Sequence, residues 1–574
     1  MSLGKRMNRL WCLCGLIGVA LALAWSGASR ADSSAHAPGL VLVGLRDGVS
    51  ARAWLAEVST PQVVAVMPGV DVAIVRVPVG QEVTAIQSLR RDPHVAFAEL
   101  DYAVHAAEAQ QSSHVVRPSA IITPNDPGWA SQWGPAKIQA PAAWSVVTGT
   151  PEVVIAVLDS GAALDHPDLV ANLWTNPREI PGNGLDDDGN GKVDDVHGWH
   201  LFHRWSGSDY VPAEDADVRD DNGHGTHVAG IAAAATNNGV GIAGVAWGAR
   251  IMPVKVLDQN GDGWHSEIAA GIMYAVDNGA RIINLSLGGA TDSLTLRAAV
   301  DYARRHGALV VAATGNDGAP WVRYPAACPG VLAVAATDSN DQRASFSNYG
   351  PQVNLAAPGT SILSTGWPGD LHTDCSSGYC YKNGTSMATP HVSGLAALIW
   401  SHWPALSANA VATQITQTVV DVASSGWDEY TGWGRLDAAS AVMTLTVPPD
   451  LWIHVTAPPL VRANQVVSYQ LLYGNGGGVA YDVYITATLP ASLNTSDPLT
   501  FLVPLVPAAS GPYQLTVTAT VSPDAPAGAA LTTTAIITSN LELDSFDNAS
   551  WTVARVVSRP IFLPLVLSDL SQSN

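Results

Sequence analysis

Hydrophobic residues follow three different patterns along the chain, and the first covers about residues 38 to 105. Apolar runs at 40–45, 70–78 and 95–102 predict strands, and the periodic segment 81–92 predicts a helix before the last of them. We therefore expect a small α+β unit here. The segment 106–124 is polar and has no periodicity, so we interpret it as an exposed linker.

The second pattern, from 125 to 446, alternates strand signals with helix signals. The runs 153–159, 250–258, 281–287 and 308–314 are almost continuously apolar, as in parallel strands that are buried on both faces. The segments 266–280 and 292–308 each begin with a capping residue and end near a glycine, as amphipathic helices do. This alternation predicts a doubly wound α/β domain with a parallel sheet, whose ligands bind at the carboxyl ends of the strands.

In the third pattern, from 447 to 558, the helical signal disappears. Segments such as 466–473, 483–490 and 514–521 alternate apolar residues with Ser, Thr or Gln between turns rich in Gly and Pro. That alternation is typical of an all-β sandwich. The remaining residues, 559–574, are expected to be a tail whose short apolar run contains a proline and is too short to span a membrane.

The N-terminus has the pattern of a secretory signal peptide over residues 1–31. Lys5, Arg6 and Arg9 precede an apolar run from about 10 to 25, and small residues follow at 29–31. The alternative is an N-terminal membrane anchor, but the run is short for a span. We expect a secreted, extracellular protein without a membrane span, with association to a cell surface as a variant of that hypothesis.

Charge narrows the range of partners. The 574-residue chain carries a formal net charge of −21, and loss of residues 1–31 removes four basic residues and no acidic one, which gives −25. A chain this acidic repels nucleic acid and anionic membranes, so we exclude a nucleic-acid partner, and it attracts divalent cations.

Three cysteines follow the signal segment, at positions 328, 375 and 380. Cys375 and Cys380 are close enough in sequence to form a disulfide in an oxidising compartment. Cys328 is left over, and we interpret it as a small buried hydrophobe.

Four polar residues are predicted at the carboxyl edge of the central sheet. Asp159 and Asn316 follow apolar strands, while His224 and Ser386 each begin a helix rich in small residues. Singly, each has a simpler interpretation: a turn or helix cap for Asp159, Asn316 and Ser386, and a core histidine or half of a metal pair for His224. Together they supply an acid, a base, a hydroxyl and an amide donor, which are the groups of a serine-nucleophile mechanism.

Five segments carry a resemblance to a known family. VLDSG (157–161), HGTHVAG (224–230), SLGG (286–289), ATGND (313–317) and GTSMATPHVSG (384–394) match, in this order, the signature segments of the subtilisin-like serine proteases. The resemblance covers about residues 125–445 and implies a serine endopeptidase that acts on polypeptides without a catalytic cofactor. Asp159, His224 and Ser386 would be its triad, and Asn316 its oxyanion donor. The alternative hypothesis is an inert or narrowly specific surface-binding protein that uses the C-terminal sandwich.

The same resemblance places the substrate next to two segments. The predicted substrate-binding residues are Ser286, Leu287, Gly288, Gly289, Ala313, Thr314, Gly315 and Arg323. The glycines of the first segment leave a backbone edge to which an extended peptide could add. Arg323 points either to solvent or into the pocket for the residue before the cut, where it would favour acidic or polar side chains.

Two segments suggest structural calcium sites. In GNGLDDDGNGKVDD (182–195), Asp186, Asp188, Asn190 and Asp194 supply closely spaced oxygen ligands, although a solvated acidic turn is the alternative. A second site rests on resemblance alone. It implies as ligands the side chains of Asp168 and Asn238 and the carbonyls of Thr236, Val240 and Ile242.

The flanking units have implied roles as well. Residues 38–105 resemble the family's inhibitory propeptide, so we expect a self-processing zymogen that is cut between about Ala106 and Asn125, with a permanent N-terminal domain as the alternative. The sandwich resembles bacterial surface modules of the DUF11 or CARDB type and could contact a cell surface or a polymer. We expect the protein to be a monomer.

Overall fold

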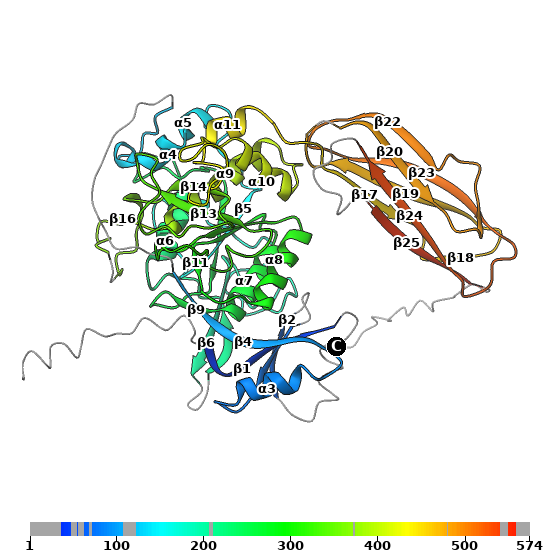
Figure 1. The fold of residues 1–574 in the computed structure, drawn as a ribbon, viewed down its shortest axis with the longest axis horizontal. Coiled ribbons are helices and arrows are strands. Elements are labelled where there is room, and N and C mark those ends of the chain that lie inside the picture. The colour runs from blue at the N-terminus through cyan, green and yellow to red at the C-terminus, as the bar shows by residue number, and fades with distance from the viewer. Residues whose placement is uncertain are drawn as a thin grey trace, which may run out of the picture.

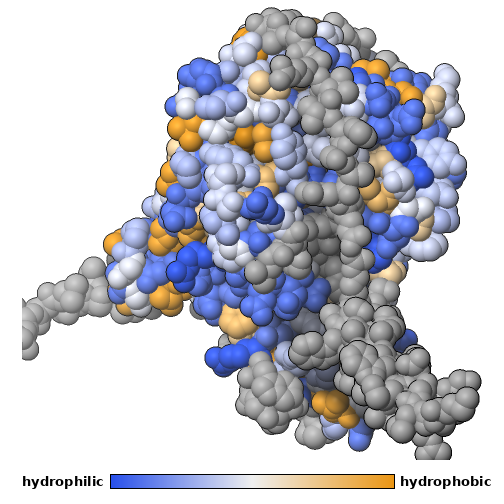
Figure 2. All heavy atoms as spheres, turned by 90° about the vertical axis from the view of Figure 1, so that its left-hand side faces the viewer, coloured by the Kyte–Doolittle hydropathy of each residue, from blue (hydrophilic) through white to orange (hydrophobic). Residues whose placement is uncertain are grey.

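We analysed a computed structural model of the chain (Figure 1). The structure describes residues 36–46, 54, 62–67, 72–106, 122–205, 210–370, 373–478, 480–539 and 549–557. The expected signal segment 1–31, most of the expected linker and the tail 559–574 lie outside these residues. On the face shown in Figure 2, the described residues are mostly hydrophilic, and the hydrophobic ones occur in small groups.

The N-terminal unit is an antiparallel sheet with one helix packed against it. It consists of β1 (His36–Leu45), β2 (Gln62–Met67), β3 (Val72–Arg76), α3 (Glu82–Leu89) and β4 (Val95–Ala106), with the strands in the order β4-β1-β3-β2. Ile86 and Leu89 of α3 pack on Val41, Val43 and Val75 in one core. The prediction of an α+β unit is therefore confirmed. Strand β2 lies in a segment for which the sequence analysis predicted no element.

The central unit is built on an eight-stranded sheet in the order β14-β13-β12-β10-β5-β8-β6-β7. Its strands are β5 (Val154–Asp159), β6 (Trp199–Trp205), β7 (Tyr210–Asp215), β8 (Arg250–Lys255), β10 (Ile282–Leu285), β12 (Leu309–Ala313), β13 (Leu332–Thr337) and β14 (Leu355–Pro358). Neighbouring strands pair in parallel, except for the antiparallel hairpin β6–β7 at one edge.

Helices cover both faces of this sheet, which explains the uninterrupted apolar runs. All six residues of β5 are buried. Ile155 and Val157 join the core that includes α6 (His224–Ala233) and α9 (Thr385–His402), whereas Val154, Ala156 and Leu158 join the core with α7 (His265–Asp277) and α8 (Leu294–Arg305). The doubly wound architecture predicted from the sequence is confirmed.

Shorter elements complete the central unit. They are η1 (Trp129–Ser131), α4 (Trp133–Lys137), α5 (Ala140–Ala143), η2 (Val170–Asn172), β9 (Asp262–Trp264), β11 (Leu287–Gly288), the hairpin β15 (Ile362–Thr365) and β16 (Tyr379–Lys382), α10 (Ala408–Gln417) and α11 (Ala438–Met443). Among the described residues, none of the helices has the length and apolarity needed to cross a membrane.

The C-terminal unit is a sandwich of two sheets around one core. One sheet has the order β17-β19-β23-β21 and the other β18-β25-β24-β20-β22. Its strands are β17 (Leu451–Thr456), β18 (Leu460–Val461), β19 (Val466–Asn475), β20 (Ala480–Thr488), β21 (Leu493–Asn494), β22 (Thr500–Val506), β23 (Ser510–Val521), β24 (Ala530–Thr538) and β25 (Ala549–Val556). Tyr469 and Leu471 of β19 share the core with Ile485 of β20 and Ile537 of β24. The predicted β-sandwich is confirmed.

Strand β4 links the N-terminal unit to the central one. Its last residues pair antiparallel with β11 on one side and with β9 on the other. The N-terminal sheet therefore continues into the central unit at the edge next to residues 286–289. Figure 1 shows β4 at the border between the two units, near β9.

Candidate active site

The four residues predicted at the carboxyl edge of the sheet lie where the sequence analysis placed them along the chain. Asp159 ends β5, His224 is the first residue of α6, and Ser386 is the second residue of α9. Asn316 follows the end of β12 by three residues. Because β5, β10 and β12 are neighbours in a parallel sheet, these positions converge on one edge.

A buried acid–base pair forms the first half of the site. Oδ1 of Asp159 lies 2.7 Å from Nδ1 of His224, and both side chains are fully buried. The same oxygen accepts a hydrogen bond of 2.8 Å from the N–H of Ser160. An ionised carboxylate can only accept, so His224 carries its proton on Nδ1 in this pair, and its Nε2 is then the basic nitrogen.

The turn before His224 is held by Asp220, which the sequence analysis missed. Asp220 is buried and accepts hydrogen bonds from the backbone N–H groups of Gly223 and Thr226 and from the hydroxyls of Thr226 and Ser160. Gly223 has a φ of 101° and offers no side-chain cap, so Asp220 caps the first turn of α6 from outside the helix. An acid shortly before a helix of small residues was the signal that could have identified it.

A loop between β15 and β16 supports the same turn. Oδ2 of Asp370 lies so close to Gly223 that a Cβ there would approach it to 2.7 Å. Asp370 forms a buried ion pair of 2.9 Å with Lys382, and a disulfide between Cys375 and Cys380 closes the loop. Cys328, by contrast, is a buried free thiol, and its burial raises its pKa to about 12.

Ser386 is fixed to the substrate-side segment by two reciprocal hydrogen bonds. Its hydroxyl donates to the carbonyl of Ser286 at 2.9 Å, and the hydroxyl of Ser286 donates to the carbonyl of Ser386 at 2.9 Å. Asn284 extends this buried network, because its side chain donates to Ser286 and accepts from Ser393 of α9. The nucleophile candidate and the segment 286–289 are therefore parts of one rigid arrangement.

The Asn316 side chain has its donors available. Its Oδ1 accepts hydrogen bonds of 2.9 and 3.0 Å from the backbone N–H and the hydroxyl of Thr385. Its Nδ2 is buried and has no hydrogen-bond partner among the described residues. A buried N–H donor without a partner is costly unless something transient accepts from it, as a developing oxyanion would.

The edge expected to bind an extended peptide holds a strand of the chain itself. Ala106 and His105 of β4 pair with Leu287 and Gly288 of β11, and Ala103 pairs with Trp264 of β9. Gly289, the last residue of the predicted segment, exchanges backbone hydrogen bonds with Tyr324.

On the far side of the predicted pocket, Ala313 ends β12 and Thr314 and Gly315 follow it. The backbone N–H of Arg323 donates to the carbonyl of Thr314 at 3.0 Å. The Arg323 side chain forms an ion pair with Asp317, so its charge is compensated rather than free in the pocket. Asp317 directly follows Asn316 in the quoted segment 313–317, and no role was predicted for it.

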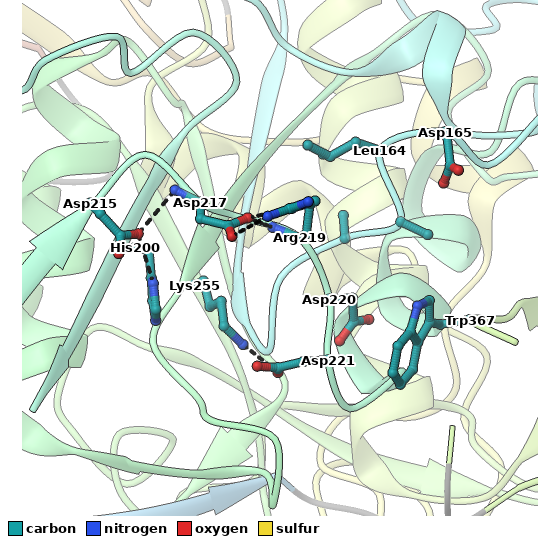
Figure 3. A pocket seen from close by; sticks show the side chains of 12 residues that line it. Leu164, Asp165, His200, Asp215, Asp217, Arg219, Asp220, Asp221, Lys255 and Trp367 are labelled. Carbon is teal, nitrogen blue, oxygen red and sulfur yellow. Dashed lines mark hydrogen bonds and ion pairs between the residues drawn. The ribbon is translucent and has the colours of Figure 1, made fainter. Parts of the chain in front are cut away.

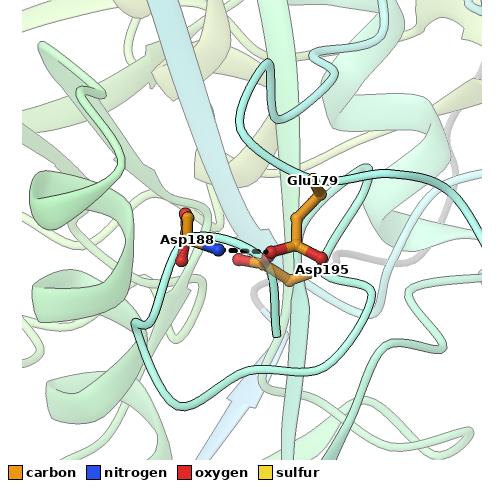
Figure 4. A group of neighbouring side chains, drawn as sticks. All are labelled: Glu179, Asp188 and Asp195. Atoms are coloured by element: carbon orange, nitrogen blue, oxygen red, sulfur yellow. Dashed lines mark hydrogen bonds between the residues drawn. The ribbon is translucent and has the colours of Figure 1, made fainter. Parts of the chain in front are cut away.

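The acidic loop brings together a different set of carboxylates from the one predicted. Ligand oxygens of Glu179, Asp188 and Asp195 lie within 4.8 Å of one another (Figure 4). Asn190 joins them through a hydrogen bond from its side chain to Asp195. Asp186 instead accepts from the N–H groups of the turn 189–191.

Asp194 also faces its own loop, since it accepts from the backbone N–H groups of residues 182–184.

Within the cluster of Glu179, Asp188 and Asp195, Oε2 of Glu179 is buried without a hydrogen-bond partner among the described residues. Burial, reinforced by Asp188, raises the pKa of Asp195. A buried oxygen with no donor beside two further carboxylates fits an oxygen-ligated cation such as Ca²⁺.

The second predicted ion site also has an acidic centre. Asp168 is fully buried and accepts from the N–H of Ile242 at 2.8 Å and from the side-chain amide of Asn238 at 3.2 Å. Burial raises the pKa of Asp168. The Asn238 oxygen accepts from Val240 N–H, so this amide would have to turn over to offer its oxygen to a cation.

Asp126, which the sequence analysis missed, contacts the same loop. It is buried and accepts from the backbone N–H groups of Asn237 and Asn238. In the sequence, Asp126 is a single acidic residue shortly after the linker. Its role can be recognised only once the fold brings it to the distant loop that contains Asn237 and Asn238. Two buried carboxylates at one loop fit a divalent cation better than they fit an apolar core.

A charged pocket of about 620 Å³ lies beside the segment that follows Asp159 (Figure 3). Its acids are largely paired: Asp217 with Arg219, Asp221 with Lys255, and Asp215 with His200. Because these charges compensate one another, and none of the four candidate catalytic residues lines the pocket, we assign it no part in the chemistry.

Comparison with known proteins gives consistent matches. Residues 150–434 match the subtilase family, and residues 25–101 match the fervidolysin N-terminal prodomain. The chain is 43% identical to thermitase of Thermoactinomyces vulgaris over 321 residues, which cover 56% of this chain and 99% of thermitase. It is 40% identical to a thermophilic serine proteinase of Bacillus sp. strain AK1, covering 63% and 77% of the two chains. It is also 40% identical to subtilisin Savinase of Lederbergia lenta, covering 54% and 97%.

Proposed function

The chain belongs to the subtilase family and is a serine endopeptidase with an N-terminal prodomain, and on this premise we propose that Asp159, His224 and Ser386 form its catalytic triad. The observation that carries the proposal is the buried pair of Asp159 and His224, 2.7 Å apart at the start of α6. A carboxylate that fixes Nδ1–H leaves Nε2 to act as a base.

In this mechanism, His224 takes the hydroxyl proton of Ser386 at Nε2 while Oγ attacks the scissile carbonyl. The resulting tetrahedral intermediate collapses as His224 returns that proton to the leaving amine, which leaves an acyl-enzyme. Water then repeats the two steps and releases the acid. Asp159 remains ionised throughout and stabilises the imidazolium.

We assign Asn316 to the oxyanion. Its Nδ2 donors have no partner among the described residues, while its oxygen is tied to Thr385, the residue before Ser386. The backbone N–H groups at the start of α9 add a positive dipole end at the same position. Donors that are fixed before negative charge develops lower the barrier to forming the oxyanion, which is the role that we assign to these two groups.

The prodomain supports synthesis as a zymogen. Strand β4 lies between β9 and β11, so it occupies an edge where a substrate peptide would pair. We propose that it inhibits the enzyme until the chain cuts itself between Ala106 and Asn125. Domain limits of 38–105, 125–446 and 447–558 follow from this proposal.

We propose two structural calcium sites. Glu179, Asp188, Asp195 and Asn190 would hold one ion, in place of the set predicted from the sequence. For the second, the chain offers Asp168, Asp126, Asn238 and the carbonyls of residues 236, 240 and 242. Calcium there neutralises buried charge and ties loops together, and hydrolysis uses the protein groups alone.

Export directed by residues 1–31, which are then removed, is part of the same proposal, as is contact of the sandwich with a surface or polymer. A fluorophosphonate probe tests the enzymatic core directly, because it labels only an activated serine. We expect the full chain to be labelled at Ser386 and to digest casein, and the Ser386→Ala variant to do neither. A full chain that is neither labelled nor active would support an inert binding protein instead.

A further inference from the structure

The Arg323 side chain lies between the two segments that flank the predicted substrate pocket. A Cβ on Gly288 of β11 would come within 3.0 Å of Cβ of Arg323. A Cβ on Gly315, beyond β12, would come within 2.8 Å of its Cδ. The aliphatic part of Arg323 therefore fills the space between these two glycines, on opposite sides of the pocket.

The guanidinium group of Arg323 is also fixed in position. Nε and one terminal nitrogen lie 2.7 and 2.8 Å from the two oxygens of Asp317, a bidentate pair. Asp317 is itself fixed by Asn348, which donates to its carboxylate at 3.0 Å and accepts from its backbone N–H at 2.8 Å. Only 19% of the Arg323 side chain is exposed. Moving it aside would break the ion pair.

The register of β4 shows which substrate residue would meet this side chain. Residues that pair directly across an antiparallel sheet point to the same face, as do residues two apart on one strand. The residue opposite Ser286 therefore shares the face on which Gly288 meets Arg323. The carbonyl of Ser286 is also 2.9 Å from the hydroxyl of Ser386, so the residue opposite Ser286 is the one at the nucleophile.

We propose that the Arg323–Asp317 pair fills the pocket for the residue on the acyl side of the cut and limits that residue to small uncharged side chains, such as Ala and Ser. This inference rests on the proposed function. Large side chains are excluded because the arginine stem occupies their volume. Acidic side chains gain nothing, because Asp317 already compensates the guanidinium, which replaces the acidic preference considered in the sequence analysis.

The chain's own sequence fits this restriction. Ala106 is the last residue of β4 and pairs with Leu287, and the residue that follows it in the sequence, 107, is also an alanine. We therefore expect self-cleavage after Ala107. Sequencing of the mature N-terminus should read Glu108 first, and a start after a large apolar residue would contradict the inference.

The decisive experiment compares peptide anilides that differ only in the residue before the cut, using the mature full-length enzyme. We expect kcat/KM for Ala to exceed that for Phe or Leu at least tenfold. Arg323→Ala should raise kcat/KM for Phe and Leu at least tenfold and favour Lys over Glu, because no arginine then compensates the charge of Asp317. Asp317→Asn should keep Phe poor and raise Glu several-fold, because the guanidinium is then unpaired.

Arg219→Ala serves as the matched control, since it removes another bidentate arginine–aspartate pair, at an exposed site that lines the separate charged pocket. It should leave all the ratios unchanged. Equal cleavage after Phe and Ala by the parent enzyme would overturn the inference, as would unchanged ratios in both variants. If the enzyme is labelled by the fluorophosphonate but does not discriminate, only this inference fails; without labelling, the proposed function fails first.

Discussion

The Nδ1 atom of His203 lies 2.7 Å from Oε1 of Glu267, with both side chains buried at the border with the prodomain. On its other side, Nε2 of His203 is 3.6 Å from Asp101 of β4. Asp101 also binds the N–H and hydroxyl of Ser266, so the prodomain caps α7 through the same carboxylate. The negative charge of Glu99, two residues earlier on β4, also raises the pKa of Asp101.

This cluster predicts a zymogen that loses stability as the pH rises. Burial raises the pKa of Glu267 to about 7 and raises that of Asp101. Burial alone would lower the pKa of His203, but Glu267 and Asp101 raise it above its ordinary value. Each raised pKa means that the folded state binds the proton more tightly, so the stabilisation is complete below the unfolded pKa values, 3.8 and 4.5 for the two acids and 6.5 for His203, and is lost as the pH rises from there through about 7.

The measurement is the melting temperature of the Ser386→Ala full chain, which cannot process itself, at pH 5 and pH 8. We expect His203→Gln to destabilise it more at pH 5 than at pH 8, because the raised pKa of His203 stabilises the fold only while the imidazole is protonated. His306→Gln, at an exposed position, should leave that difference near zero. An equal or larger effect at pH 8 would contradict the role of the cluster.

Replacement of the nucleophile should remove activity while keeping the fold. We expect Ser386→Ala to lower turnover by on the order of 10⁶, because the triad acts as a unit. The variant should also stay at the length of the zymogen on a denaturing gel. Circular dichroism matching that of the parent would show that the loss is chemical, and residual processing at the parental rate would rule out Ser386 as nucleophile.

The oxyanion assignment predicts a loss in turnover rather than in binding. Asn316→Ala should lower kcat by about 10²–10³ with little change in KM, since the donors act only in the transition state. Asn316→Asp is the sharper variant, because it keeps an acceptor for Thr385 but removes the N–H donors. Asn340→Ala, in an exposed turn, is the control. A kcat retained in Asn316→Asp would exclude the assignment.

Removal of calcium should lower stability, not chemistry. EDTA is expected to reduce the melting temperature of the Ser386→Ala chain, and added Ca²⁺ to restore it, because an ion that binds only the folded state stabilises it by mass action. Glu179→Gln should weaken this response more than Asp186→Asn, whose carboxylate only shapes the turn. A melting temperature that EDTA leaves unchanged would refute both ion sites.

Local patterns were sufficient to predict the elements that carry the site. The run 153–159 had no polar residue before Asp159, so a strand buried on both faces was the only economical interpretation. The segment 292–308 was predicted as a helix that begins with a capping residue, and α8 does lie in it, with Ser293 as the cap whose side chain accepts from the N–H of Leu296. The hairpin β6–β7 was not predicted, because its many charged and aromatic residues show no alternation.

Pairings between distant residues could not be predicted in this way. Glu179 and Asp195 are 16 positions apart, and Asp126 contacts a loop more than 100 residues away. From the sequence, Asp317 is simply the residue after Asn316, and its ion pair with Arg323 could not be predicted. Spacing along the sequence indicates which residues belong to the same helix or strand. An ion pair between separate segments depends instead on how those segments pack in the folded protein.

The reciprocal hydrogen bonds between Ser286 and Ser386 have a consequence for how the enzyme meets a substrate. In the proposed mechanism, these bonds join the backbone edge that aligns the peptide to the residue whose oxygen attacks it, before any peptide binds. A substrate that pairs correctly is thereby placed at the nucleophile, and no closing movement is needed to assemble the two. The enzyme then selects its substrates when they first bind. A peptide that fits the preformed site is cleaved without a conformational change, and a peptide that does not fit dissociates.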